Sequence, residues 1–149
     1  MDSIREINEH DPLDEAAQLL HSLRQQYTFQ ELLEKIREQQ LVHGYQLVGS
    51  YNDQNELVGI AGFIEGHSLA WGHYLLIEDL VVSDDRQGNG VGEKLLSWLR
   101  RLAYSRGCRE LHVNSGLQRF FAHKLFLQEG FRISSHHFSL KLLPDMAAD

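Results

Sequence analysis

The stretch Asp85-Arg-Gln-Gly-Asn-Gly-Val-Gly92 decides the fold, because of what stands on either side of it. An apolar, strand-like segment, Tyr74 to Val82, precedes it, and an amphipathic segment with helical spacing, Glu93 to Arg106, follows it. The alternate glycines let the backbone adopt conformations closed to other residues and remove side chains that would block a close ligand. A helix that starts here would present unpaired N–H groups at the positive end of its dipole. The sequence therefore predicts an anion site, most often one for phosphate or pyrophosphate.

The composition is that of an ordinary globular chain. Its 149 residues are 42% hydrophobic and 23% charged, which fits one domain spanning residues 1–149. No apolar run approaches the ~20 residues needed to span a bilayer, and the N-terminus lacks the apolar core of a signal peptide. We therefore expect a cytoplasmic protein with no membrane partner. The lone Cys108 excludes an intrachain disulfide, and we expect it to be a packed thiol.

The charge balance is acidic and unevenly distributed. Fourteen Lys and Arg residues stand against twenty-one Asp and Glu residues. The acidic excess lies mostly before residue 86, whereas the segment from Arg86 to Arg109 is locally basic. This distribution argues against nucleic acid as a partner, because duplex binding needs a basic face. It fits a cationic small substrate near the acidic half and an anionic ligand held by the other half.

Periodicity and turn residues predict the order β-α-α-β-β-β-α-β-α-β, an α/β chain with a mixed, mostly antiparallel sheet flanked by helices. A short strand is expected at residues 4–7, then a helix that starts at Asp11-Pro12 and a second helix with a capping box at Thr28–Glu31. Strands follow at 45–51, 56–64 and 71–82, separated by turns at 52–55 and 66–68. The remaining elements are a helix at 93–106, a strand at 111–113, a helix at 117–129 and a long last strand at 131–142.

Three kinds of nucleotide-binding loop compete for the glycine run. A P-loop needs Lys-Ser or Lys-Thr after its glycines, which is absent, and the dinucleotide fingerprint needs Gly-x-Gly-x-x-Gly, which the spacing does not match. Gln87-Gly-Asn-Gly-Val-Gly92 instead resembles the Gln/Arg-x-x-Gly-x-Gly/Ala signature of the GCN5-related N-acetyltransferases. Ala122-His-Lys-Leu-Phe-Leu-Gln-Glu-Gly-Phe131 is similar to that family's later Ala-x-x-x-Tyr-x-x-x-Gly-Phe segment. The matched pieces, with the shared element order, span about residues 45 to 142.

The resemblance implies acetyl-CoA as co-substrate. Backbone N–H groups of the glycine loop would cradle its pyrophosphate, and its pantetheine arm would run beside the fourth strand, next to the point where the fifth strand (Glu110 to Asn114) splays away. Ser115 would bind the cofactor or cap the next helix, and capping is the preferred alternative. Arg119 departs from the family pattern, which often has Asn at this position. It lies four residues before His123 on one helical face, and it would either meet a cofactor phosphate or an acidic substrate group or have a structural role only. The implied cofactor-binding residues are Leu80, Val81, Val82, Gln87, Gly88, Asn89, Gly90, Val91, Gly92, Ser115, Arg119 and Phe126.

Acetyl transfer to an amine requires a group that accepts the proton of the ammonium, whose pKa is about 10. Glu78 and Asp79 are the candidate catalytic carboxylates, and strand alternation places them on opposite faces. We favour Glu78 as the base, although a β-bulge could reverse the phase and Glu78 could instead only pair with a cation. The backbone N–H of Leu80 is the candidate polariser of the thioester carbonyl. The family's usual general acid, a tyrosine, is Phe126 here, which cannot donate a proton.

The histidines do not predict a metal site. His136 and His137, considered with His112 or His123, are adjacent on an expected strand and would point to opposite faces, and no metal-binding spacing supports them. The sequence thus favours an N-acetyltransferase that moves an acetyl group to an amine by direct transfer in a ternary complex. A small-molecule acceptor is favoured over a protein amine, and a homodimer stays open. The alternatives are an inactive CoA-binding sensor or partner module and, less favoured, a nicotinamide-dependent oxidoreductase.

Overall fold

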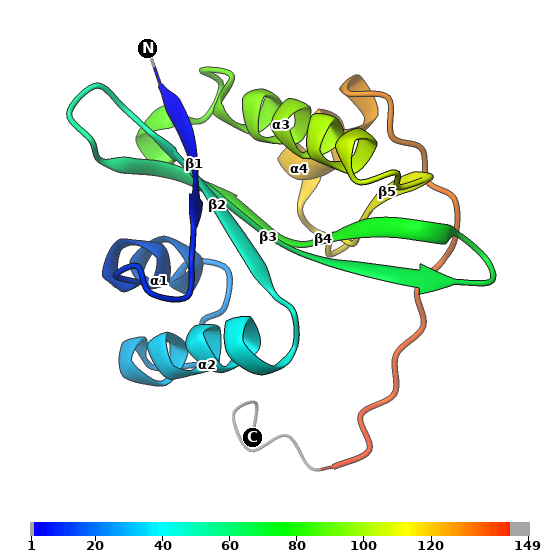
Figure 1. Cartoon of the computed structure of the whole chain (residues 1–149), viewed down its shortest axis with the longest axis horizontal. Helices are drawn as coiled ribbons and strands as arrows, with labels where there is room; N and C mark the ends of the chain where they lie inside the picture. Colours follow the sequence, from blue (N-terminus) through cyan, green and yellow to red (C-terminus); the bar gives the residue numbers. More distant parts are fainter. Residues whose placement is uncertain (1, 144–149) are drawn as a thin grey trace.

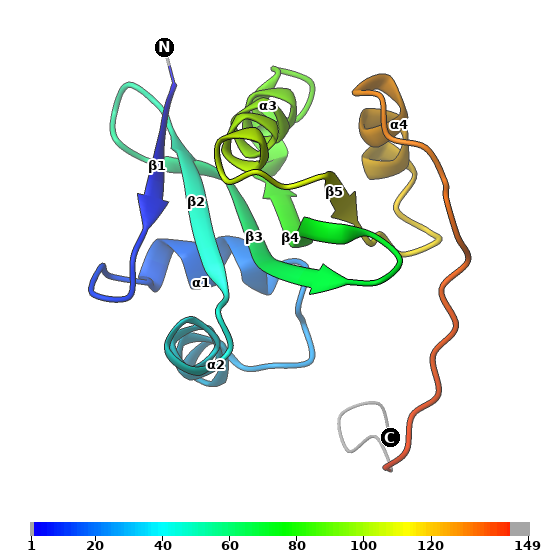
Figure 2. The same cartoon turned by 45° about the vertical axis from the view of Figure 1, so that its right-hand side comes forward.

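The structure, a computed structural model, describes residues 2–143 and contains a mixed five-stranded sheet in the order β1-β2-β3-β4-β5. Neighbouring strands from β1 to β4 are antiparallel, whereas β5 is parallel to β4. Helices α1 and α2 cover one face of the sheet, and α3 and α4 lie on the other (Figures 1 and 2). The strands are β1 (Ser3–Ile7), β2 (Gln46–Tyr51), β3 (Leu57–Ser68), β4 (Gly72–Val82) and β5 (Glu110–Val113). The helices are α1 (Asp14–His21), α2 (Phe29–Val42), α3 (Val91–Ser105) and α4 (Phe120–Gln128), with a 3₁₀ turn η1 (Asp84–Arg86) before α3.

Each face of the sheet has its own apolar core. Leu95, Leu96 and Leu99 recur at helical spacing on α3 and are fully buried against the strands. On the opposite face, Leu20 of α1 and Ile36 of α2 pack against residues of β2 and β3. The mixed sheet with helices on both faces confirms the predicted fold class, and most predicted elements lie within a few residues of their observed bounds.

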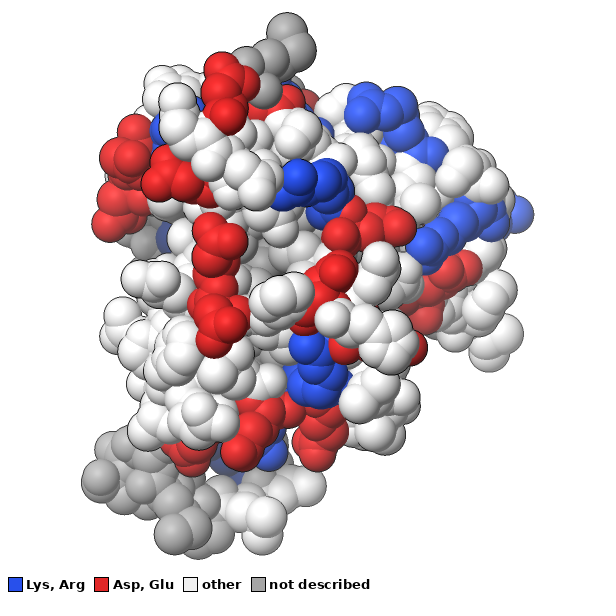
Figure 3. Space-filling view, turned by 60° about the vertical axis from the view of Figure 1, so that its left-hand side comes forward, with Lys and Arg blue, Asp and Glu red and all other residues white. Residues whose placement is uncertain are grey.

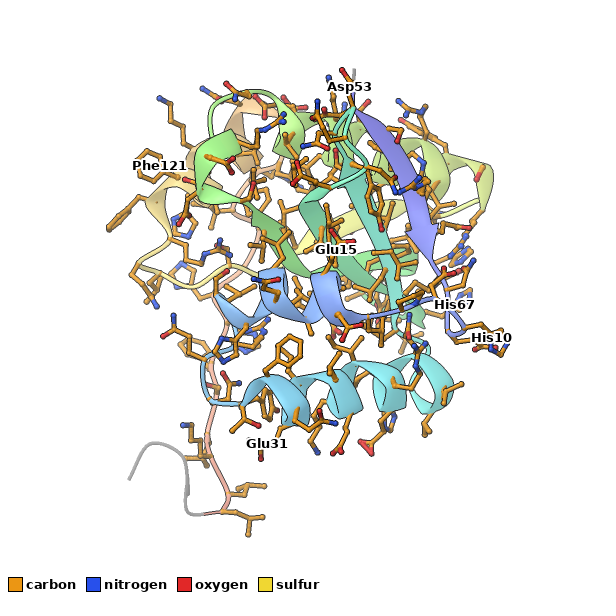
Figure 4. All side chains as sticks on the ribbon, turned by 90° about the vertical axis from the view of Figure 1, so that its left-hand side faces the viewer. His10, Glu15, Glu31, Asp53, His67 and Phe121 are labelled. Atoms are coloured by element: carbon orange, nitrogen blue, oxygen red, sulfur yellow. The ribbon has the colours of Figure 1, made fainter. Side chains whose placement is uncertain are left out.

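The starts of the first two helices differ in how they are capped. The capping box of α2 is present: Thr28 Oγ1 accepts from the Glu31 N–H, and the Glu31 carboxylate accepts from the Thr28 N–H at 2.8 Å. Figure 4 shows Glu31 at the start of α2. These hydrogen bonds lower the pKa of Glu31. Helix α1 starts at Asp14, not at Asp11 as expected, because the Asp11 carboxylate instead accepts a hydrogen bond from the Asn8 N–H.

The predicted turn at residues 66–68 is wrong. Strand β3 continues through these residues to Ser68, and the turn to β4 lies at residues 69–71, closed by a hydrogen bond from the Trp71 N–H to Ser68 Oγ. Gly66 is a point of close packing within the strand, since a Cβ there would lie 2.5 Å from Tyr74 Oη. A glycine that signals a turn in the sequence thus serves to admit a cross-strand tyrosine.

The last strand predicted at residues 131–142 does not form. After Gly130, whose φ is +94°, the chain leaves α4 and runs away from the sheet as an extended segment without a ladder partner among the described residues (Figures 1 and 2). Helix α4 also starts later than expected, at Phe120, because residues 117–118 form a turn closed by the Arg119 N–H and the Gly116 carbonyl. Within residues 2–143, no helix combines the length and apolarity needed to cross a membrane.

Candidate active site

A β-bulge in β4 sets the geometry of the candidate site. The register between β3 and β4 skips one residue of β4, Glu78, which lies between the paired residues Ile77 and Asp79. The extra residue reverses the alternation, so Ile77 and Leu80, an odd and an even position, both face the α3 core. Asp79 consequently faces the α1–α2 side. The bulge that the sequence left open is therefore present, and it separates the two candidate carboxylates.

Asp79 is buried in a hydrogen-bonded network. Its Oδ2 accepts from Tyr45 Oη at 2.7 Å, and its Oδ1 accepts from Arg24 Nε at 2.8 Å. Arg24 Nη2 also donates to the backbone carbonyl of Glu78 at 3.0 Å. Burial and the Asp79 charge raise the pKa of Tyr45 well above its usual range, so this phenol keeps its proton and remains a donor. The network ties the segment after α1 and the start of β2 to the middle of β4.

A pocket of about 190 Å³ opens where β4 and β5 part. The two strands pair only as far as Ile77 and Val113, after which β4 continues to Val82 while the chain beyond β5 turns away. The edge of β4 beyond the bulge therefore has no strand neighbour on this side among the described residues. The pocket is lined by Leu23, Arg24, Glu78, Leu80, Val113, Asn114, Ser115, Gly116, Gln118, Arg119 and Phe126.

Leu80 and Val82 direct their backbone N–H and C=O groups toward this open edge. Ser83 lies opposite Val58, and its N–H donates to the Val58 carbonyl, so these two residues form a hydrogen-bonded pair at the end of the β3–β4 ladder. Because such pairs alternate with non-bonded pairs along an antiparallel ladder, Val81 bonds to β3, whereas Leu80 and Val82 point away from it. The Val82 carbonyl accepts a hydrogen bond from Gln87 Nε2 at 3.3 Å, whereas the outward N–H and C=O of Leu80 have no strand partner among the described residues and are left for an extended ligand beside β4.

Glu78 lies at the wall of the pocket. Burial raises the pKa of its carboxyl, the neighbouring Asp79 charge raises it further, and Arg24 opposes the shift. A carboxylate with a raised pKa is a stronger base than an exposed one. Glu78 is thus the only carboxylate among the pocket-lining residues, next to the outward N–H of Leu80.

The glycine loop leads from β4 into α3 with two residues in the left-handed region. Gly88 has φ +87° and Gly90, the N-cap of α3, has φ +83°, and a Cβ on either would meet nothing within 4 Å. Glycine is therefore required there by backbone conformation and not by space. At Gly92 a Cβ would lie 2.8 Å from Leu125 Cδ2 of α4, so the end of that leucine side chain would have to shift. No side chain caps α3, so its first N–H groups are left for an anion.

The residues after β5 contribute further groups to the pocket. The expectation that Ser115 caps α4 is wrong: Arg119 is the N-cap residue and no side chain caps this helix. Ser115 Oγ is instead buried at the pocket without a hydrogen-bond partner among residues 2–143. Burial lowers the pKa of Arg119, as does the nearby charge of Arg24. His123 has a structural contact, since its Nε2 lies 2.7 Å from the Gly116 carbonyl oxygen.

Phe126 occupies the pocket wall where the sequence resemblance placed a tyrosine. It is buried, and its ring packs against Phe131 at a centroid distance of 5.7 Å. The site residues that sequence reasoning missed are Arg24 and Tyr45, which join Asp79 from positions far away along the chain. No local pattern marks them, since Arg24 follows a helix in an irregular segment and Tyr45 stands at the start of the strand expected at residues 45–51.

Away from the pocket, Glu65, His73 and Cys108 place potential metal ligand atoms within 4.8 Å of one another. Glu65 already accepts a hydrogen bond from Arg106 at 2.9 Å and lies 2.5 Å from His73 Nε2. Burial raises the pKa of Cys108, which favours the neutral thiol. We interpret these residues as a polar network at the end of the β3–β4 hairpin.

Comparison with known proteins identifies the family. The chain belongs to the acetyltransferase (GNAT) family, whose profile matches residues 4–131. The aminoalkylphosphonate N-acetyltransferase of Salmonella typhimurium is 30% identical over 66 residues, a match that covers 44% of this chain and 43% of that protein. YhdJ, an uncharacterised N-acetyltransferase of Bacillus subtilis, is 26% identical over 125 residues, or 83% of this chain and 87% of that one. The aminoglycoside N-acetyltransferase AAC(6')-Iy, solved in complex with CoA, shares the fold with a TM-score of 0.83 at 17% identity over 95% of this chain and 94% of that chain.

Proposed function

We propose that this protein transfers an acetyl group from acetyl-CoA to an amine of a small molecule, directly and within a ternary complex. The observation that carries the proposal is the pocket between β4 and β5, in which Glu78 stands beside the outward-facing backbone of Leu80. The open edge of β4 leads from this pocket to the uncapped start of α3. In this proposal, β4 and the helix that follows it hold acetyl-CoA from the thioester to the pyrophosphate.

The residues divide the chemistry between them. The Leu80 N–H donates a hydrogen bond to the thioester carbonyl oxygen and stabilises the negative charge that develops there. Glu78 accepts the proton of the amine, directly or through one water, so that the free electron pair of nitrogen attacks the carbonyl carbon. A C–N bond forms and the C–S bond breaks. The acetyl group leaves on the amine, and CoA leaves as a thiolate that takes up a proton.

The departing thiolate has no phenol beside it. Phe126 has no proton to give, and the only side-chain hydroxyl among the pocket-lining residues is Ser115 Oγ, which is buried and unpaired within the described chain. We propose that the Ser115 hydroxyl donates a hydrogen bond to the bound acetyl-CoA and that the thiolate takes its proton from water. A buried hydroxyl without a partner is costly, so a ligand atom that pairs with it gains affinity.

The acceptor that fits best is a small amine that also carries an acidic group. Arg119 is partly buried at the pocket and forms no ion pair with another described residue, whereas Arg24 is held by Asp79. The relative named aminoalkylphosphonate N-acetyltransferase points to the same class of compound. Asp and Glu side chains spread over the side of the molecule that bears β1 and α1 (Figure 3), and β1 is the edge of the sheet opposite to β5.

The test is release of free CoA thiol, measured with a thiol-reactive dye, across aminoalkylphosphonates, amino acids, aminoglycosides, polyamines and a lysine peptide. We expect release with a small amine and its loss in Glu78→Gln, with binding of acetyl-CoA retained by calorimetry. For Arg119→Gln, a rise in the acceptor KM alone assigns Arg119 to the acceptor, and a rise in the acetyl-CoA KM assigns it to the cofactor.

A second candidate function, a CoA-binding module without turnover, is favoured by Phe126, because the position of the usual acid cannot donate a proton. It predicts tight binding of acetyl-CoA with no thiol release for any amine. Absence of binding would contradict both functions.

A further inference from the structure

Three side chains with metal-binding atoms meet at the end of the β3–β4 hairpin, at the opposite end of β5 from the pocket. Glu65 lies in β3, His73 in β4, and Cys108 between α3 and β5. Their ligand atoms lie within 4.8 Å of one another, and residues 2–143 contain no second group of three His, Cys, Asp or Glu side chains that is this compact. The Arg109 N–H donates to the His73 carbonyl at 2.7 Å, which fixes the segment with Cys108 beside β4 (Figures 1 and 2).

The two strands direct their side chains of this cluster to one face of the sheet. Residues two apart on a strand share a face, so Glu65 lies on the face of Phe63 and His73 on the face of Leu75. Phe63 and Leu75 are both buried in the α3-side core, and Cys108 packs against the same core. The cluster therefore lies at the margin of a packed core, which fixes the backbone on which its members stand.

Neighbouring groups orient two of the three side chains. Arg106 Nη1 donates to Glu65 Oε1 at 2.9 Å, and the other oxygen, Oε2, lies 2.5 Å from His73 Nε2. Arg106 Nη2 in turn donates to Gln46 Oε1 at 2.8 Å. The His67 ring stacks on the His73 ring at a centroid distance of 4.3 Å. Contacts of this kind behind the ligands orient the ligands of metal sites in proteins.

The distances fit a metal ion after a small movement of one side chain. Zinc–ligand bonds of about 2.0–2.3 Å in a tetrahedral arrangement place the ligand atoms roughly 3.3–3.8 Å apart. Glu65 Oε2 and His73 Nε2 are closer than this, so an ion between them would have to separate them by about 1 Å. The Glu65 side chain is 33% exposed, which leaves it room to rotate.

The donor atoms select the metal. Mg²⁺ and Ca²⁺ prefer oxygen ligands, whereas carboxylate oxygen, imidazole nitrogen and thiolate sulfur together suit Zn²⁺. We propose that Glu65, His73 and Cys108 bind one Zn²⁺ ion through Oε2, Nε2 and Sγ, with water as the fourth ligand. The polar network described above is the arrangement of these residues without the ion. When bound, the ion joins the β3–β4 hairpin to the segment between α3 and β5.

Binding is balanced in protons and charge. The Cys108 thiol releases its proton as the Zn–S bond forms, and His73 Nε2 exchanges its contact with Glu65 for a bond to the ion. The Glu65 carboxylate and the Cys108 thiolate then supply two negative charges against the two positive charges of Zn²⁺. Arg106 is a neighbouring cation, but it stays paired with Glu65 Oε1 while the ion binds Oε2.

The experiment uses the full chain, freed of metal by dialysis against a chelator and kept reduced. We expect calorimetry with ZnCl₂ to give one ion per chain. Saturating ZnCl₂ should raise the melting temperature by several degrees, since a ligand that binds only the folded state stabilises it. CoCl₂ should give the visible bands of tetrahedral cobalt and a thiolate-to-cobalt charge-transfer band in the near ultraviolet, which reports Cys108 as a ligand.

Substitutions locate the site. Cys108→Ser and His73→Gln each remove one ligand and should weaken Zn²⁺ binding at least about tenfold. The matched control is His112→Gln, because His112 Nε2 lies 2.6 Å from a Glu110 carboxylate oxygen but belongs to no group of three ligand atoms within residues 2–143. This variant should bind Zn²⁺ as the wild type does. Circular dichroism checks that each variant is folded.

A reduced wild type that takes up no ZnCl₂ overturns the proposal, and so does a cobalt complex without the charge-transfer band. Because this band is measured on the wild type, it decides the case even where a variant unfolds. Zinc binding that persists unchanged in Cys108→Ser also overturns the proposal, since the ion would then be held by other residues.

Discussion

The adjacent carboxylates of β4 should respond in opposite ways to loss of charge. Asp79→Asn keeps the shape of the side chain but removes the charge that holds Arg24 and Tyr45. Hydrogen bonds to a charged group stabilise a fold by about 1.5–3 kcal/mol each. The asparagine oxygen still accepts from Arg24, and its amide can donate to the Tyr45 hydroxyl, so only the charge-assisted part of the two bonds is lost.

The magnitude follows from how far solvent reaches the pair. The Asp79 side chain is 11% exposed but that of Arg24 is 39% exposed, which screens part of the attraction. We expect Asp79→Asn to lower the free energy of unfolding by roughly 2 kcal/mol, within the range for a weakened hydrogen-bonded charge pair. For a domain of this size that corresponds to a fall in melting temperature of about 4–8 °C.

Glu78→Gln, in contrast, should leave the fold at least as stable as the wild type and abolish activity. Burial raises the pKa of Glu78, so the folded state favours the protonated form, and its contribution to stability is lost as pH rises through the folded pKa. Glutamine mimics the protonated form, so at neutral pH its melting temperature should equal or exceed that of the wild type, while thiol release is lost. Thermal unfolding and the thiol assay measure both variants. The assignment of Glu78 as the base and of Asp79 as a structural residue is refuted if Glu78→Gln unfolds at a lower temperature than the wild type, or if Asp79→Asn abolishes turnover at unchanged stability.

Three further changes test the site. Gly90→Ala forces a side chain into φ +83°, which costs about 1–2 kcal/mol. The free loop relaxes away from this conformation and must return to it to bind, so affinity for CoA in calorimetry should fall several-fold, and unchanged affinity would contradict the loop assignment. The pKa of Glu78 lies above its ordinary value of 4.5, so the rate of acetyl transfer should fall as the pH falls through that pKa. Glu78→Gln should abolish this pH dependence, and a wild-type rate that stays constant down to pH 4 would exclude Glu78 as the base. Ser115→Ala removes a hydrogen-bonding group worth about 0.5–1.5 kcal/mol and should raise the acetyl-CoA KM about 2–10-fold without loss of stability; an unchanged KM would show that Ser115 does not bind the cofactor.

The glycine loop and the helix after it could be predicted from the sequence because their causes are local. Gly88 and Gly90 are glycines because their φ values are positive, and the Leu spacing of α3 follows from one buried face. Gly66 shows the limit of this reasoning, since glycine marks a turn and a close contact equally well. Only the position of Tyr74 on the facing strand decides between them.

The polar network could not be predicted, because its members are brought together only by the fold. Arg24 and Asp79 are separated by 55 residues in sequence, and Tyr45 reaches the same carboxylate from the start of β2. The prediction of a last strand at residues 131–142 was wrong for a related reason. The alternation of Phe138, Leu140 and Leu142 is intrinsic to the sequence, but a strand also needs a neighbour, and residues 131–142 have none within residues 2–143.

The bulge links the anchoring of β4 to its chemistry. Without the extra residue, the alternation of β4 would continue unbroken from Ile77, and Asp79 would face the α3 core as an unpaired charge. The insertion of Glu78 turns Asp79 toward Tyr45 and Arg24, which satisfy it, and leaves Glu78 itself outside the ladder at the pocket wall. It also sets which N–H groups beyond the bulge face the open edge, Leu80 among them. One additional residue therefore anchors Asp79 in its network and leaves Glu78 and the outward N–H of Leu80 together at the pocket, where we propose that the thioester and the amine meet.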